Sequence, residues 1–548
     1  MKTHIQILAT AVLAIICNCT ANALTPPPDG SYPNFTTAEG QNALKKLTSG
    51  AGNTGIGWVS LFSATAASFN TGIGAGTLAL NTADRNTATG AVALFLNTGG
   101  TQNTANGALA LLHNDIGSFN TAVGDSALFD NTSGLGNTAV GFESLVANTT
   151  GGFNTGVGNG ALLNNTTGSN NTATGTGALG ANTTADDNTA TGFQALFSNA
   201  AGTRNTATGT RALSNNVDGN SNTATGIETL FSNTTGSSNT AEGDGALTSN
   251  IDGNRNTGVG STALGFNSGG SDNTAVGANA LSTNSTGLEN SAIGSGALQF
   301  NGGDHNTGIG KDALNGNTVG LQNTAIGFAS LFSNIGGTSN TAVGNIALLN
   351  SLGDGNTAIG ASAGINVTTA SNVICIGIPG QNVSNSCFIG NVFATTSTGG
   401  IGVMVNASGQ LGTMTSSRRF KENIRPIGKA SEALYTLKPV TFNYKKEIDP
   451  DSIDQFGLVA EEVERVNSDL IVRDEEGKAY SVRYDQVNAM LLNEFLKEHE
   501  QVQAQQKQID TLTTQLKEQE LRIQDITDRI GTSNRRTELA ETGARTGD

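Results

Sequence analysis

A phrase of the type Asn-Thr-Ala-x-Gly recurs through most of this chain at an interval of 17 residues, shortened to 16 in three places. A unit this short cannot hold a pair of helices, but it can form one coil of a β-solenoid, whose equivalent positions stack on one another. The repeat therefore predicts a parallel β-solenoid of about 19 coils over residues 53–371. The asparagine that opens each unit stands at positions 53, 70, 86, 103, 120, 137, 154, 171, 188, 205, 222, 239, 256, 273, 290, 306, 323, 340 and 356.

One unit, NTAVGDSALFDNTSGLG from Asn120 to Gly136, shows how such a coil could fold. Two short apolar clusters are separated by a glycine, and we expect Val123, Ala127 and Leu128 to form inward ladders. The recurring Gly124 indicates either a positive φ or an approach of two chains too close for a Cβ. Only 5% of the residues are aromatic and 73 are glycine, so a large conventional core is not expected.

Two units, NTAIGFASLF from Asn323 and NTAIGASAG from Asn356, match a known pattern closely. They resemble the head repeats of YadA-like trimeric adhesins, which read NxxAIGxxAxAxG. The resemblance implies a mainly β chain with a left-handed parallel β-roll, and a homotrimer. The unit is longer than the usual head repeat, so each coil must hold an extra turn or loop.

Residues 1–23 have the character of a secretory signal peptide, with an early lysine, an apolar run and a small-residue cleavage site at Ala21-Asn22-Ala23. A lipoprotein would use Cys17, but Ile16 stands where a small residue is needed. We therefore expect export, to the outside of the cell or to its outer-membrane surface rather than to the periplasm. No further run has the length of a membrane span, so none is expected in the mature chain.

Cys375 and Cys387 would remain after cleavage. They could form a disulfide in an oxidising compartment, or be two small buried apolar residues. The four histidines form no ligand cluster, so neither a metal nor a cofactor is expected. The net charge of -16 disfavours nucleic acid as a partner.

The composition changes after residue 371. Residues 24–52 are an amino-terminal segment, residues 372–415 are expected to be a neck, and residues 416–486 read as a small α+β domain. The stretch TLKPVTFNYK alternates like a strand, DQFGLVAEEVERV reads as a strand followed by an amphipathic helix, and LIVRDEEGKAYSVRY reads as a hairpin.

Residues 487–530 carry a heptad pattern that predicts a trimeric coiled coil, and residues 531–548 are polar enough to be disordered. A single amphipathic helix packed on its own domain is the alternative. The seam consists of Leu491, Phe495, Val502, Ile509, Leu512, Leu516, Ile523, Ile526 and Ile530.

The stretch SSRRFKENI, followed by the strand and helix patterns above, resembles the intramolecular chaperone domain found after phage endosialidases and tail fibres, which is a self-cleaving peptidase. The resemblance covers Ser416 to Glu500. It implies Ser416 as nucleophile and Lys421 as general base, with cleavage of the Thr415-Ser416 bond. The supporting motif positions are Ser417, Arg419, Asn423 and Ile424, and Ser417 stands where the family has an acidic residue.

The chemistry sets conditions for this dyad. A lysine can act as a base only when desolvation or a neighbouring cation favours its neutral form, and Arg418 and Arg419 are the nearest cations. Five residues is neither one helical face nor one strand face, so the pair must form across a tight turn or between chains. A linker with solvated side chains is the alternative.

The favoured hypothesis is a secreted or cell-surface fibrous protein, adhesin-like and homotrimeric, whose carboxy-terminal chaperone assembles the β-roll and then cleaves itself off. Its ligand would be a glycan or a host or surface protein. The alternative is a phage-like tail fibre, or a glycan-binding or glycan-acting fibre. Catalysis would be limited to one self-cleavage, because the repeat offers no pair of acids typical of glycan hydrolysis.

Overall fold

The computed structural model describes residues 33–406, 408–474 and 476–542. The chain divides into two compact units between Thr395 and Thr396, and each is described by itself. The predicted signal peptide lies outside the described residues.

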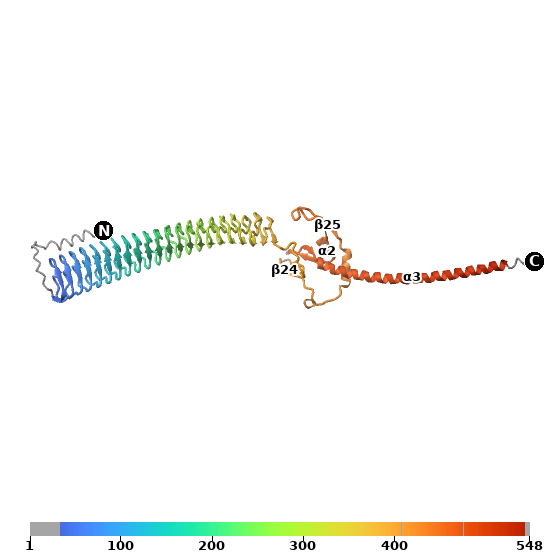
Figure 1. The fold of residues 1–548 in the computed structure, drawn as a ribbon, viewed down its shortest axis with the longest axis horizontal. Helices are drawn as coiled ribbons and strands as arrows, with labels where there is room; N and C mark the ends of the chain where they lie inside the picture. Colours follow the sequence, from blue (N-terminus) through green and yellow to red (C-terminus); the bar gives the residue numbers. More distant parts are fainter. Residues whose placement is uncertain (1–32, 407, 475, 543–548) are drawn as a thin grey trace, which may run out of the picture. The chain divides into compact units, whose positions relative to one another are not determined.

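The first unit is a solenoid with one sheet of 22 short strands. Successive coils stack side by side, as the blue-to-yellow part of Figure 1 shows. The strands are β1 (Thr37–Glu39), β2 (Thr54–Ile56), β3 (Thr71–Ile73), β4 (Thr87–Thr89), β5 (Thr104–Asn106), β6 (Thr121–Val123), β7 (Thr138–Val140), β8 (Thr155–Val157), β9 (Thr172–Thr174), β10 (Thr189–Thr191), β11 (Thr206–Thr208), β12 (Thr223–Thr225), β13 (Thr240–Glu242), β14 (Thr257–Val259), β15 (Thr274–Val276), β16 (Ser291–Ile293), β17 (Thr307–Ile309), β18 (Thr324–Ile326), β19 (Thr341–Val343), β20 (Thr357–Ile359), β21 (Val373–Ile376) and β22 (Ser386–Ile389).

Each strand pairs in parallel with the next strand along the chain, and equivalent residues face each other, as in Thr121 with Thr138. This confirms the predicted parallel β-solenoid. In β6 the middle residue, Ala122, is fully buried, whereas Val123 is 36% exposed. The expected inward ladder of Val123 is therefore wrong, because strand side chains alternate between two faces and the alanine takes the inner one.

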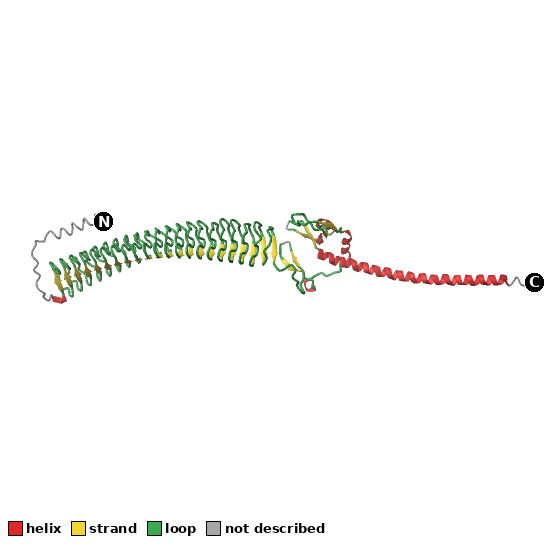
Figure 2. Cartoon of the chain, turned by 45° about the horizontal axis from the view of Figure 1, so that its top comes forward, coloured by secondary structure: helices red, strands yellow, loops and turns green. Residues whose placement is uncertain are grey.

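The second apolar cluster of each coil is a turn rather than a strand, so the strands form one row and loops complete the coil (Figure 2). Ala127 and Leu128 are fully buried there, as expected. Ser126 and Leu128 adopt left-handed backbone conformations, with φ of 58° and 52°. The strain is offset because both backbone N–H groups donate to neighbouring coils, at 2.9 Å and 3.0 Å.

Two ladders of buried asparagines run through the solenoid. In the first, the Asn120 side-chain oxygen accepts from the backbone N–H of Asn137 at 2.9 Å, and its Nδ2 donates to the Gly134 carbonyl at 2.9 Å. In the second, Asn131 Nδ2 donates to Asn114 Oδ1 at 2.7 Å. The invariant asparagines of the repeat are thus interior hydrogen-bonding groups, because buried polar atoms need partners.

The solenoid extends past both predicted limits. Strand β1 lies in the segment expected to precede the repeats, and β21 and β22 lie in the expected neck. Cys375 and Cys387 are free thiols. Cys387 pairs with Ile374, so the two sulfur atoms point to opposite faces of the sheet. The disulfide interpretation is therefore wrong.

The second unit contains three two-stranded antiparallel sheets and several helices. The predicted strand, strand-to-helix and hairpin patterns are confirmed by β25, by β26 with α2, and by β27 with β28. The elements are β23 (Val403–Val405), β24 (Leu411–Thr413), the 3₁₀ helices η2 (Arg418–Phe420) and η3 (Gly428–Thr436), β25 (Val440–Phe442), β26 (Gln455–Gly457), α2 (Ala460–Val466), the 3₁₀ helix η4 (Ser468–Leu470), β27 (Ile471–Arg473), β28 (Ala479–Val482) and α3 (Tyr484–Thr542).

A small apolar core holds this unit together. Val463 of α2, Ile471 of β27, Val482 of β28 and Met490 of α3 are all buried in it. Helix α3 contributes only its first turns to this core and continues to Thr542. Residues 531–542, expected to be disordered, are therefore helical.

None of the helices in the described ranges combines the length and the apolar character that crossing a membrane requires.

Candidate self-cleavage site

Ser416 and Lys421 come together across a single tight turn. Ser416 follows strand β24, and the 3₁₀ helix η2 then reverses the chain, with the Lys421 N–H donating to the Arg418 carbonyl at 3.1 Å. The reversal brings Lys421 Nζ to 3.1 Å from Ser416 Oγ, within hydrogen-bonding distance. In the single chain the pair therefore forms across the turn.

The pair lies open to solvent. Ser416, Lys421 and the residues around them are exposed in the single chain. Phe420 and Ile424, which flank Lys421 in the sequence, are also 58% and 54% exposed. The dyad therefore has nucleophile and amine in contact but lacks the desolvation that a lysine base requires.

The neighbouring motif residues have different structural roles. Arg419 places its guanidinium 4.6 Å from the centre of the Phe420 ring, and so stacks on it. Ser417 stands at the amino-terminal end of η2, and its side chain makes no capping hydrogen bond.

Asn423 shows why an asparagine suits its position. Its φ is 53°, in the left-handed region that asparagine tolerates better than most residues. This conformation turns the chain two residues after Lys421. The motif asparagine is thus a backbone requirement, which the sequence pattern alone does not reveal.

We expect Asn423→Gly to cleave at the wild-type rate and Asn423→Val to cleave about tenfold more slowly, since a β-branched residue is strained by about 1–3 kcal/mol at positive φ. Densitometry of a time course on denaturing gels measures both rates. Equal rates for the valine and glycine variants would contradict this role of the backbone.

A second polar cluster links η3 to α3 by hydrogen bonds. Glu494, which is 7% exposed, accepts hydrogen bonds from the Ser431 hydroxyl, from the Tyr435 hydroxyl at 2.7 Å and from Lys497 Nζ at 2.7 Å. Asn493 Nδ2 donates to Ser431 Oγ at 2.7 Å. We call these residues the Glu494 clamp. The clamp joins η3 residues to α3 residues that lie about 60 positions later in the sequence, so no local pattern could have revealed it.

The clamp makes the stability of this unit depend on pH. Lys497, followed by the two hydroxyls, lowers the pKa of Glu494 from 4.5 to about 2, and Glu494 raises the pKa of Tyr435. Because the folded pKa of Glu494 is the lower one, its stabilisation is complete above about pH 4.5 and is lost as the pH falls towards 2.

We expect the melting temperature of the helical signal to fall over this pH range, and the Glu494→Gln variant to show a smaller fall from an already lower value. Circular dichroism of the full chain measures both. Glu518→Gln, at an exposed position of α3, is the matched control. An unchanged pH dependence in Glu494→Gln would refute the clamp.

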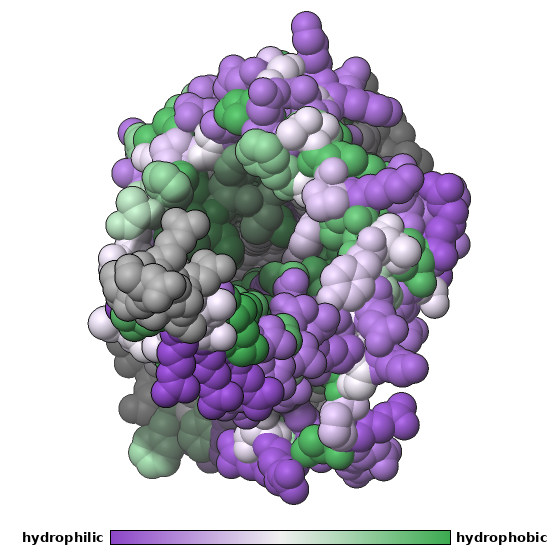
Figure 3. All heavy atoms as spheres, turned by 90° about the vertical axis from the view of Figure 1, so that its right-hand side faces the viewer, coloured by the Kyte–Doolittle hydropathy of each residue, from purple (hydrophilic) through white to green (hydrophobic). Residues whose placement is uncertain are grey.

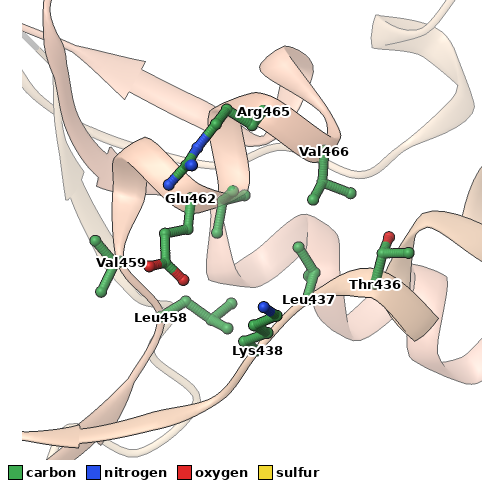
Figure 4. A pocket seen from close by; sticks show the side chains of 9 residues that line it. Thr436, Leu437, Lys438, Leu458, Val459, Glu462, Arg465 and Val466 are labelled. Atoms are coloured by element: carbon green, nitrogen blue, oxygen red, sulfur yellow. The ribbon is translucent and has the colours of Figure 1, made fainter.

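A hollow of about 220 Å³ lies beside α2, between that helix and the segment that leads to β25 (Figure 4). Leu437, Leu458 and Val466 line its apolar side, whereas Glu462 and Arg465 contribute charge. Neither Ser416 nor Lys421 lines it, so it is separate from the dyad. Among residues 33–406, 408–474 and 476–542, no three His, Cys, Asp or Glu side chains are close enough together to hold a metal ion.

Comparison with known families matches residues 416–472 to the family described as chaperone of endosialidase. The match begins at Ser416, the residue at which the sequence motif predicts that the domain begins. The chaperone resemblance is thereby confirmed, and the solenoid is compatible with the resemblance to YadA-like repeats. No curated protein matches the chain.

Proposed function

We propose that the chain is an exported, homotrimeric fibrous surface protein, whose carboxy-terminal domain assembles the β-solenoid and then cuts itself off between Thr415 and Ser416. The observation that carries this proposal is the 3.1 Å contact between Lys421 Nζ and Ser416 Oγ at the first residue of a chaperone-of-endosialidase domain. A solenoid fibre followed by this domain is also the arrangement of a tail-fibre-like protein.

The cleavage step uses only groups of this chain and water. The neutral Lys421 amine takes the proton of Ser416 Oγ as the oxygen attacks the Thr415 carbonyl carbon. The bond from that carbon to the Ser416 nitrogen breaks, and the nitrogen takes up a proton from Lys421. Water then hydrolyses the ester, which leaves a Thr415 carboxylate and a fragment that begins with Ser416.

Helix α3 supports self-association through its unpaired apolar seam. Leu491, Ile509, Ile526 and the other seam residues are between 54% and 63% exposed in the single chain. Apolar residues at this spacing are buried only when helices wind around one another. Figure 3, which views the molecule from the α3 end, shows hydrophobic residues at the surface among hydrophilic ones.

The outer face of the solenoid sheet supports the same conclusion. From β2 to β22 the strands contain one charged residue, Glu242. The outward positions are otherwise occupied almost throughout by threonine, valine and isoleucine. A long face of mostly β-branched residues with a single charge is suited to packing against a second copy of itself.

Assembly would also complete the dyad. A neighbouring chain that covers Phe420 and Ile424 would remove water from the Lys421 amine, and desolvation disfavours the ammonium form of a lysine. Cleavage would then follow correct assembly, and an unassembled chain would keep its chaperone. Release after assembly suits a fibre of parallel coils, whose pairing is non-local and slow to form.

The tail-fibre alternative differs from this proposal in export and in ligand, not in assembly. The predicted signal peptide favours export of the chain by a cell. A glycan or a host or surface protein remains the expected ligand of the fibre.

The test is to purify the chain from residue 24 and to follow it over time by light scattering and by amino-terminal sequencing of the smaller fragment. We expect a mass of three chains and a fragment that begins Ser-Ser-Arg-Arg. A stable single-chain mass would overturn the trimer, and a different fragment start would overturn the assigned bond.

A further inference from the structure

An apolar edge occupies the loops that precede β6, β7 and β8. Ile116, Phe119, Leu135 and Phe153 are 59%, 59%, 43% and 62% exposed, and they come from three successive coils. Single exposed apolar residues are ordinary on a protein surface, but a group of four large ones on adjacent coils marks a candidate binding surface.

The two phenylalanines are held in fixed positions. Both have left-handed backbones, with φ of 62° at Phe119 and 58° at Phe153, and both N–H groups donate to the preceding coil, at 3.0 Å and 2.9 Å. A Cβ on Gly136 would lie 2.9 Å from the Phe153 ring, so that ring rests against bare backbone. A backbone fixed in this way limits the freedom that each phenylalanine loses when a ligand binds.

Charged residues mark the two ends of the edge along the solenoid. The loop residues 99–102, 116–119, 133–136, 150–153 and 167–170 contain no ionisable side chain. Charged residues appear at the same loop positions on both sides, at Asp84 and Arg85 before and at Asp186 and Asp187 after. Asp115, which is exposed and directly precedes Ile116, is the ionisable residue next to these loops, and no lysine or arginine occurs between residues 86 and 203. An anionic ligand would therefore meet a like charge and no cation there, which favours a neutral ligand.

The spacing of the rings indicates the shape of the ligand. Phe119 and Phe153 occupy equivalent positions of coils that are two apart, and strands are about 4.8 Å apart, which separates the two positions by about 9.6 Å along the solenoid. This is close to the length of one disaccharide in an extended β-1,4-linked polysaccharide. Phenyl faces stack on the apolar faces of such sugar rings.

We infer that the edge formed by the loop residues 99–102, 116–119, 133–136, 150–153 and 167–170 binds a neutral, extended β-1,4-linked polysaccharide that lies parallel to the solenoid axis, with Phe119 and Phe153 each stacked on a sugar ring. The hydroxyl and amide groups of Ser118, Gln102 and Asn170 lie along the same edge and can contact sugar hydroxyls. This inference rests on the proposed function only in treating the solenoid as a binding fibre, and it does not require cleavage.

The experiment is co-sedimentation of the full chain, in the Ser416→Ala form and in the unmodified form, with insoluble cellulose and with chitin. We expect retention on at least one, and a loss of affinity of about tenfold in each of Phe119→Ala and Phe153→Ala. Phe153→Trp keeps a stacking face and is expected to be retained. Phe266→Ala is the matched control, because Phe266 is 61% exposed outside this edge.

Absence of retention on both polysaccharides would overturn the inference, and so would alanine variants that bind as tightly as the unmodified chain. Light scattering of the same samples gives a second decisive outcome. If Phe119→Ala or Phe153→Ala lowers the number of chains in the particle, the edge is a contact between copies and the inference fails. Because the Ser416→Ala form is measured in parallel, a failure of the binding inference can be told apart from a failure of the cleavage proposal.

Discussion

The Ser416→Ala variant is expected to remain a single band on a denaturing gel under conditions in which the unmodified chain gives two. The reason is the contact of 3.1 Å between Lys421 Nζ and Ser416 Oγ, which makes this hydroxyl the one that can lose its proton to a nearby amine. Removal of a nucleophile or its base lowers the rate of a serine hydrolase by at least about a thousandfold. The Lys421→Ala variant should therefore be equally intact.

Two control variants make this result specific. Ser417→Ala removes a neighbouring hydroxyl that makes no capping hydrogen bond, so cleavage should continue. Lys421→Arg keeps a positive charge, but arginine does not act as a base, so cleavage should stop. If Ser416→Ala still yielded a fragment that begins at position 416, the nucleophile assignment would be refuted.

The sequence was informative wherever the repeat or a local spacing carried the information. The period of 17 residues predicted stacked coils, and the buried Ala127 and Leu128 confirm part of the expected interior. The chaperone motif also located the residues that η2 brings together. These features depend on neighbours within one coil or one turn.

Features that depend on backbone strain or on distant contacts were not predicted. Val123 was expected inside, yet Ala122 takes the inner face of the strand and Val123 the outer one. The left-handed Leu128 has no glycine to signal it, since its conformation is imposed by hydrogen bonds from the next coil. The Glu494 clamp and the β23 to β24 hairpin were likewise not predicted from the sequence pattern.

Removal of one ladder asparagine is expected to open the solenoid locally. In Asn120→Ala the N–H of Asn137 loses its acceptor at 2.9 Å and the fully buried side chain leaves a void. An unsatisfied buried donor costs about 1–3 kcal/mol, and the void adds to this. We therefore expect a loss of about 2–4 kcal/mol in the two coils concerned. Asn159→Ala, at an exposed position, is the matched control and should be nearly neutral.

Hydrogen exchange measured by mass spectrometry locates this effect. In Asn120→Ala the peptide that contains the Asn137 amide should exchange faster by about 30-fold or more, because each 1.4 kcal/mol of lost local stability is about tenfold in exchange. Exchange in distant coils should not change, because a solenoid transmits stability only between neighbours. Within the described residues, Asn334 Oδ1 is the one buried side-chain polar atom without a partner, and it lies where Ser351 replaces the next asparagine of its ladder. The chain thus tolerates an unpaired atom where a ladder ends, and an unchanged exchange rate in Asn120→Ala would mean that it tolerates one in the middle as well.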